Sequence, residues 1–276
     1  MTNNYTENFD NRLNGVRTAF VFPKPLAPRA GFRHMAIMVT QTIKRFYKKA
    51  DAAFDDGGAG WRVQLDGRAV KTPAKADFVL PSEVLAREIA AEWDAQGEKI
   101  LPHTMPIMQR AATAIDRVRP NRTTVVAELT GYGRSDLLCY RAAFPTDLVE
   151  RQAKAWQPLL DWAAQELGVE LTVTEGVMPV SQREDALMRI QDLINGFDDY
   201  YLTALHNLTT VSGSVIVALA VIHGRINAHE ASECALLDEE YSIEQWGDDA
   251  EAVERRDRHR AEILATGRYL ELLMAR

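Results

Sequence analysis

The chain has 276 residues, of which 46% are hydrophobic and 26% are charged, and its formal net charge at pH 7 is -7. This length suffices for one large domain or two smaller ones, and the composition is that of a folded globular protein. The negative charge argues against non-specific binding of nucleic acids. The two cysteines, Cys139 and Cys234, lack C-x-x-C spacing, which favours a reducing compartment.

The first forty residues contain no continuous apolar segment of the kind that forms a secretory signal. Their scattered arginines faintly suggest an organelle transit peptide, but Glu7 and Asp10 weaken that interpretation. We therefore predict that residues 1–40 form a disordered tail, with Met35 and Met38 as alternative start sites.

Residues 41–81 are predicted to form a small β domain. The segment "WRVQL" lies between the turn-forming sequences "DDGGAG" and "DG", and its residues Trp61, Val63 and Leu65 alternate with polar ones. This pattern indicates an antiparallel sheet of three to five strands, half-buried on one face.

Residues 82–276 are predicted to be helical throughout. Ser82 is a candidate N-cap, and Leu85, Ile89 and Trp93 then recur at four-residue spacing. Seven to nine helices are expected. The fold class is therefore α+β, with a small N-terminal antiparallel β domain followed by a larger all-α domain.

Two further helical segments are predicted near the C-terminus. The apolar run "VSGSVIVALAVI", residues 211–222, is too short to cross a bilayer and is predicted to be a buried core helix. A long helical stretch is expected from about residue 228 to residue 275.

Glycine-rich and histidine-rich segments offer no phosphate or metal site. Gly57, Gly58 and Gly60 precede a strand instead of opening a helix, so they present no helix N-terminus to a phosphate. The segment "HEASE" at 229–233 lacks the second histidine of a zinc motif. We expect no metal, no cofactor and no catalytic residues.

Candidate nucleophiles are equally isolated. Cys139 has no nearby base and is interpreted as a small buried side chain. His206 and His223 lie on apolar helices, where a hydrogen-bonded core or interface histidine is the expected role. Asp136 and Arg141 are structural or binding candidates that either pair with each other or face a cleft.

The most unusual feature of the sequence is an acidic segment near its C-terminus. Between Arg225 and Arg255 the chain has no Lys or Arg but carries ten carboxylates. Glu240 and Glu244 are like-charged neighbours at i,i+4, an arrangement that destabilises an isolated helix. Groups outside this segment must offset that repulsion.

Two interpretations of the acidic segment are compatible. In the structural one, Glu239 or Glu240 pairs with a base on another helix, such as Arg141 or Arg110. In the functional one, carboxylates and aromatic anchors form a protein-binding surface. The predicted partner-binding residues are Glu239, Glu240, Tyr241, Glu244 and Trp246.

Several long segments, in this order, resemble one known family. They are "LDGRAVKTPAKADFVLPSEVLAREIAAEWDAQGEKILPHTMPIMQRAATAIDRV", "SDLLCYRA", "RQAKAWQPLLDWA", "GVMPVSQ", "ALHNLTTVSGSVIVALAV" and "LLDEEYSIEQWGDDAEAVERR". Together they resemble the ATP synthase assembly chaperones that bind the alpha subunit of the catalytic F1 head. The resemblance extends from about residue 46 to the C-terminus.

This resemblance implies a non-enzymatic chaperone that binds unassembled alpha subunit and prevents its aggregation until the beta subunit replaces it. It carries a functional role onto Glu239, Glu240 and Trp246. It also matches Trp93 and Asp94, for which a structural role is favoured and a binding role is the alternative. No nucleic acid, membrane insertion or small-molecule substrate is expected. The bacterial cytoplasm is the expected location, with the mitochondrial matrix as the alternative.

The sequence leaves two other functions open. A helical-domain hydrolase or metal-dependent enzyme requires Glu239 and Glu240 to converge with His206 or His223. An adaptor requires the β domain and the helical domain to bind different partners, with the acidic helix serving only the fold.

Overall fold

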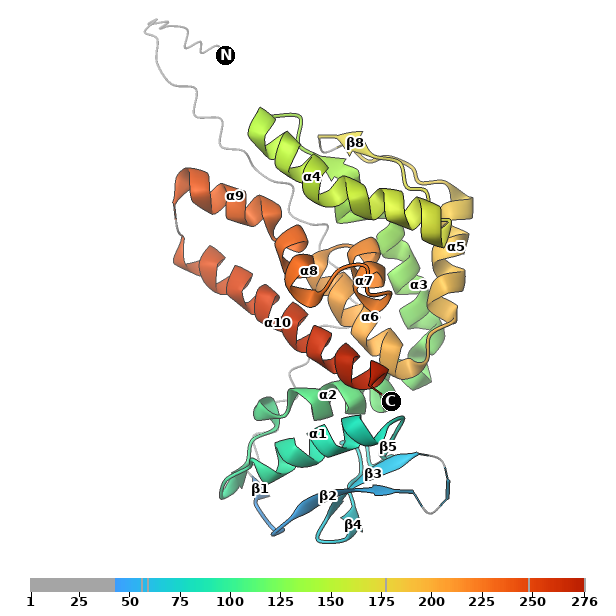
Figure 1. The fold of residues 1–276 in the computed structure, drawn as a ribbon, viewed down its shortest axis with the longest axis vertical. Coiled ribbons are helices and arrows are strands. Elements are labelled where there is room, and N and C mark those ends of the chain that lie inside the picture. Colours follow the sequence, from blue (N-terminus) through green and yellow to red (C-terminus); the bar gives the residue numbers. More distant parts are fainter. Residues whose placement is uncertain (1–42, 56, 59, 177, 248, 276) are drawn as a thin grey trace, which may run out of the picture. The chain divides into compact units, whose positions relative to one another are not determined.

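The structure is a computed structural model that describes residues 43–55, 57–58, 60–176, 178–247 and 249–275. The predicted tail at residues 1–40, with its alternative starts at Met35 and Met38, lies outside the described residues. The predicted α+β class is confirmed, since strands at the start of the described chain are followed by helices (Figure 1).

The main sheet is antiparallel and has four strands: β2 (Ala50–Phe54), β3 (Trp61–Leu65), β4 (Arg68–Ala69) and β5 (Val79–Leu80). Strand β2 pairs with one edge of β3, and β4 and β5 share the other edge. Asp66 and Gly67 form the β3–β4 turn with positive φ angles of 49° and 80°, which this hairpin type requires. The predicted alternation holds, with Val63 and Leu65 buried.

Helix α1 (Glu83–Asp94) packs along β2 and β3 (Figure 1). The Ser82 hydroxyl accepts from the Leu85 N–H at 3.3 Å, as the N-cap prediction requires. Strand β1 (Ile43–Lys44) pairs with β6 (Lys99–Ile100), which follows α1. Since α1 and β6 both pack in the strand region, a boundary between residues 81 and 82 stays a prediction.

The remaining elements are mostly helical. They are α2 (Pro106–Thr113), α3 (Arg122–Tyr132), α4 (Thr146–Trp162), α5 (Glu184–Asn195), α6 (Asp199–Ser212), α7 (Val215–Ile222), α8 (Ala228–Ala235), α9 (Leu237–Trp246) and α10 (Ala250–Met274), with a parallel strand pair β7 (Tyr140–Arg141) and β8 (Thr174–Glu175). Every residue of α7 is buried, which confirms the predicted core helix. No described helix is long and apolar enough to cross a membrane.

The C-terminal region differs from its prediction. The single helical stretch expected over residues 228–275 is divided into α8, α9 and α10, so the described chain has ten α-helices where seven to nine were expected. Leu236 separates α8 from α9, and Gly247, with a φ of 85°, follows α9. Glycine adopts this conformation without the steric cost of a side chain, which accounts for the break between α9 and α10.

Helices α8 and α10 approach each other closely. A Cβ placed on Gly267 of α10 would lie 2.3 Å from the Cβ of Ala228 in α8. Gly267 is buried, so a glycine at this position allows the two backbones to pack in direct contact.

Candidate protein-interaction site

Helix α9 carries most of the predicted site, and side chains of α4 and α10 hold it in place. The Gln152 amide of α4 donates to Asp238 at 2.7 Å, and Arg151 of α4 donates to Glu244 at 2.7 Å. From the other side, Arg260 of α10 forms an ion pair with Glu240. The expected compensation from outside the acidic segment is thus confirmed.

The compensating bases are not those that the sequence suggested. Arg110 pairs with Glu262 of α10 at 2.7 Å. Arg141 donates to the carbonyl oxygens of Leu138 and Gln152, at 2.7 and 3.1 Å. Both arginines are buried and engaged elsewhere, so the candidate partners Arg110 and Arg141 were wrong for Glu239 and Glu240.

Glu239 lies in a partly buried environment beside α10. Burial raises its pKa, and the nearby positive charges of Arg255 and Arg256 on α10 act in the opposite direction. Burial likewise raises the pKa of Asp238, although its hydrogen bond from Gln152 opposes the shift. This end of α9 therefore holds negative charge in a partly desolvated environment.

The two predicted aromatic anchors have different environments. Tyr241 is buried, its hydroxyl donates to Asp147 at 2.9 Å, and the Arg151 guanidinium lies 5.3 Å from its ring centroid. Trp246 is 69% exposed at the end of α9. Tyr241 thus fixes α9 on α4, and Trp246 is the aromatic ring of α9 that a partner can reach.

Asp136 and Arg141 do not contact each other in the described structure. The fully buried carboxylate of Asp136 accepts from Ser214 Oγ at 2.7 Å and from the backbone N–H groups of Leu138 and Ile216. Burial raises the pKa of Asp136 to about 6, and these hydrogen bonds oppose the rise. Asp136 therefore joins the segment after α3 to the start of α7 and does not face a cleft.

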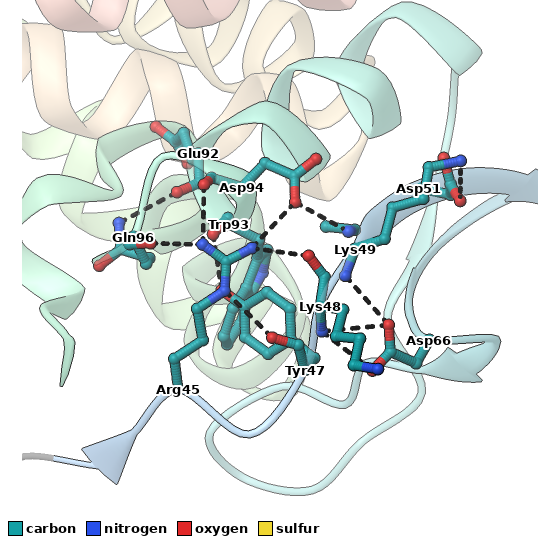
Figure 2. A network of polar contacts seen from close by, with 11 residues as sticks. Arg45, Tyr47, Lys48, Lys49, Asp51, Asp66, Glu92, Trp93, Asp94 and Gln96 are labelled. Carbon is teal, nitrogen blue, oxygen red and sulfur yellow. Dashed lines mark hydrogen bonds and ion pairs between the residues drawn. The ribbon is translucent and has the colours of Figure 1, made fainter. Parts of the chain in front are cut away.

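Trp93 and Asp94 lie at the end of α1, away from α9 in sequence, and belong to a polar network (Figure 2). Arg45 donates to the Asp94 carboxylate at 3.3 Å and to the backbone carbonyl oxygens of Asp94 and Lys48 at 3.0 Å. Asp94 also accepts from the Ala50 N–H at 2.9 Å. These contacts connect α1 to the first strands, in keeping with a structural role.

The groups named by the enzyme alternative, Glu239 and Glu240 with His206 or His223, are not brought together among the described residues. His206 lies 3.6 Å from Glu128, and His223 packs beside Trp162 and Phe197. No contact among the described residues joins either histidine to Glu239. Burial raises the pKa of the Cys139 thiol to about 12, which leaves it protonated.

The "HEASE" segment is explained by the start of α8. Glu230 closes a capping box with Asn227, and His229 lies 3.4 Å from Glu233. Within the described ranges no group of three His, Cys, Asp or Glu side chains is arranged to hold a metal ion.

Three residues of the site were missed from the sequence. Arg151, Gln152 and Arg260 are separated from their α9 partners by 93, 86 and 20 residues. The segments around them resembled the family, but no spacing rule links them to α9. Only the absence of bases within α9 indicated that such partners exist.

The structure thus presents an acidic helix held by its neighbours, with an exposed tryptophan at its end, on an α+β scaffold. Comparison with known proteins identifies its family. The model of the family described as ATP12 chaperone protein matches residues 44–164. The chain belongs to the ATP12 chaperone family, which confirms the resemblance to the ATP synthase assembly chaperones.

Individual relatives agree with this assignment. The chain is similar to the crystal structure of Atp12 from Paracoccus denitrificans, with 42% identity, a TM-score of 0.80, and coverage of 83% of this chain and 97% of that one. A mutant of the Paracoccus protein gives 41% identity with the same TM-score and coverage. The protein atp12, mitochondrial, of Schizosaccharomyces pombe is 26% identical over 230 residues, which cover 78% of each chain.

Proposed function

We propose that this protein is a chaperone that binds unassembled alpha subunit of the ATP synthase F1 head and releases it when the beta subunit takes its place. Membership of the ATP12 chaperone family supports a role in assembly. The observation that carries the choice of site is the exposed Trp246 beside carboxylates that neighbouring helices hold in position.

The geometry suits reversible binding. Trp246 offers a large apolar ring, the residue type most often found at the energetic centre of an interface. The side chains of the Glu244–Arg151 pair are 51% and 46% exposed, so solvent screens their attraction, and Glu244 can exchange its arginine for a basic group of the client. Such exchange gives specificity without the affinity that would prevent release.

Co-purification of alpha subunit from the native cell tests the proposal. Trp246→Ser and Glu240→Lys are expected to reduce recovery of alpha subunit at least tenfold while the circular dichroism spectrum is retained. Two control substitutions lie elsewhere on the exposed surface, Met188→Ser on α5 and Glu166→Lys after α4, and both should leave recovery unchanged. Unchanged recovery with both α9 variants would remove this helix from the site.

The activity class and location form part of the same proposal. We propose that the protein is not an enzyme and needs no cofactor, and stoichiometric metal in the purified protein would contradict this. Relatives come from a bacterium and from the fungus whose protein is described as mitochondrial. We propose the bacterial cytoplasm, with the mitochondrial matrix as the alternative, and fractionation of the native cell distinguishes the two.

A further inference from the structure

A second surface, distant in sequence from α9, has the composition of a binding groove. It is an apolar groove of about 920 Å³ between the main sheet and the start of α2. Its lining includes Phe46, Val70, Trp93, Ile100 and Met108. This volume and this mainly apolar lining are typical of sites that bind a ligand or a peptide.

Exposed apolar side chains stand at this groove. Phe46 is 69% exposed and Ile43 is 51% exposed, and both are lining residues. They flank Arg45, whose hydrogen bonds to the end of α1 fix this part of the backbone (Figure 2). Exposed apolar side chains gathered at a rigid groove mark an interaction surface.

The groove wall includes a firmly held aromatic residue, Trp93. Trp93 is only 9% exposed, and its indole Nε1 finds no acceptor among the described residues. The ring is held in place, because the Tyr47 ring packs edge-on against it at 5.7 Å and the Tyr47 hydroxyl donates to the Trp93 carbonyl at 2.6 Å. The indole Nε1 itself is buried from solvent, so Trp93 offers the groove an apolar ring and not a hydrogen-bond donor.

The charges at the groove favour an acidic occupant. The side chain of Arg68, which lines the groove, forms no ion pair within the described structure. Lys71 lies 3.8 Å from Asp77 in a pair whose two side chains are about two-thirds exposed. Asp66 is the one carboxylate among the described lining residues, and it already accepts hydrogen bonds from the backbone N–H groups of Lys48 and Lys49.

We infer that this groove binds an extended apolar segment of the client polypeptide that carries a carboxylate. The apolar side chains of that segment pack against Phe46 and Met108, and its carboxylate pairs with Arg68. The inference rests on the proposed function, because it takes unassembled alpha subunit as the client. The groove is then a second contact point whose basic rim differs in charge from acidic α9.

Site-specific photo-crosslinking of the full-length chain in its native cell tests the location. p-Benzoylphenylalanine is placed at position 46 in the groove, at position 246 on α9, and at position 188 as an exposed control. The expected result is a crosslink from position 46, and none from position 188, to an apolar alpha-subunit segment that contains Asp or Glu.

The other outcomes overturn the inference in distinguishable ways. A crosslink from position 46 to residues 1–42 of the same chain, or to a second copy, assigns the groove a different occupant. If position 46 gives no crosslink while position 246 crosslinks to alpha subunit, the groove is not a contact site, and the proposed function still stands. Absence of alpha subunit at both positions and from the co-purified material rejects the proposed function and the inference together.

Two substitutions test the proposed contacts. Phe46→Ser removes an exposed aromatic ring from the groove, and is expected to reduce retention of alpha subunit about fivefold. Arg68→Glu is expected to reduce retention about tenfold. Arg117→Glu, an exposed control, should have no effect. Retention that is unchanged in both groove variants, with folding verified by thermal melts, would overturn the assignment.

Discussion

Arg260 on α10 donates a hydrogen bond to the carboxylate of Glu240 on α9, and these side chains are 33% and 35% exposed. The pair connects α10 to α9, the helix that carries the proposed binding surface. Its contribution to the free energy of unfolding is therefore expected to be modest, because partial exposure screens the attraction.

A double-mutant cycle measures this contribution. Glu240→Gln, Arg260→Gln and the double variant are expected to give a coupling free energy of about 0.5–1 kcal/mol in urea unfolding at low salt. Raising the ionic strength should reduce the coupling. A coupling above about 3 kcal/mol would show instead that this pair is a main support of the fold.

Because the pKa of Asp136 is raised in the folded protein, we expect the free energy of unfolding to depend on pH. Its folded-state pKa of about 6 lies above the ordinary value of 3.8, so the folded protein binds the proton more tightly than the unfolded chain. This stabilising contribution is fully present below about pH 4 and is lost as the pH rises through 6. The shift corresponds to about 3 kcal/mol.

The measurement compares denaturant unfolding of the wild type and Asp136→Asn between pH 4 and pH 7.5. Asn also disturbs the hydrogen bonds to Ser214 and Ile216, so its absolute stability is expected to be lower. The informative quantity is the slope. If the variant loses stability with rising pH as steeply as the wild type, another group is responsible.

Glu92 is expected to stabilise the start of α2. Its two carboxylate oxygens accept from the backbone N–H groups of Ile107 and Met108 at 2.8 Å each, groups that have no partner inside the helix. Glu92→Ala should lower the free energy of unfolding by about 1–3 kcal/mol. Glu98→Ala, at an exposed position, should change it by less than about 0.5 kcal/mol. Equal effects of the two substitutions would contradict the capping role.

The close approach of α8 and α10 gives a fourth prediction. Gly267→Ala places a methyl group against Ala228 and should destabilise the protein by about 1–3 kcal/mol, because the two backbones must separate. Gly131→Ala in α3 is the matched control, since its added Cβ meets no atom within 4 Å. The control should be neutral or stabilising by up to about 1 kcal/mol, owing to the higher helix propensity of alanine. Thermal melts of both variants decide the matter.

The parts of the fold predicted from the sequence are those with local causes. The Asp66–Gly67 turn and the Ser82 cap depend on neighbouring residues, and the buried helix α7 follows from an uninterrupted apolar run. The long-range ion pairs could not be predicted in this way. The choice of Arg260 over Arg110 for Glu240 depends on how α9 and α10 pack, and no periodicity encodes that.

The candidate site shows the same division. The acidic composition of α9 indicated that positive charge must come from elsewhere, and the exposed Trp246 was among the predicted anchors. The burial of Tyr241 was not predicted, because its contact with Asp147 joins residues 94 positions apart. The unpaired indole of Trp93 also escaped sequence reasoning, since its environment combines strands, α1 and α2.

The pairing of β1 with β6 has a consequence during synthesis. Ile43 is opposite Ile100, so this ladder cannot close until the intervening strands and helix have left the ribosome. Until then the apolar residues around Phe46 have no folded neighbours, and the nascent protein is itself exposed to aggregation. A member of this chaperone family would thus itself be prone to aggregation during synthesis, until β6 has been made and its own fold is complete.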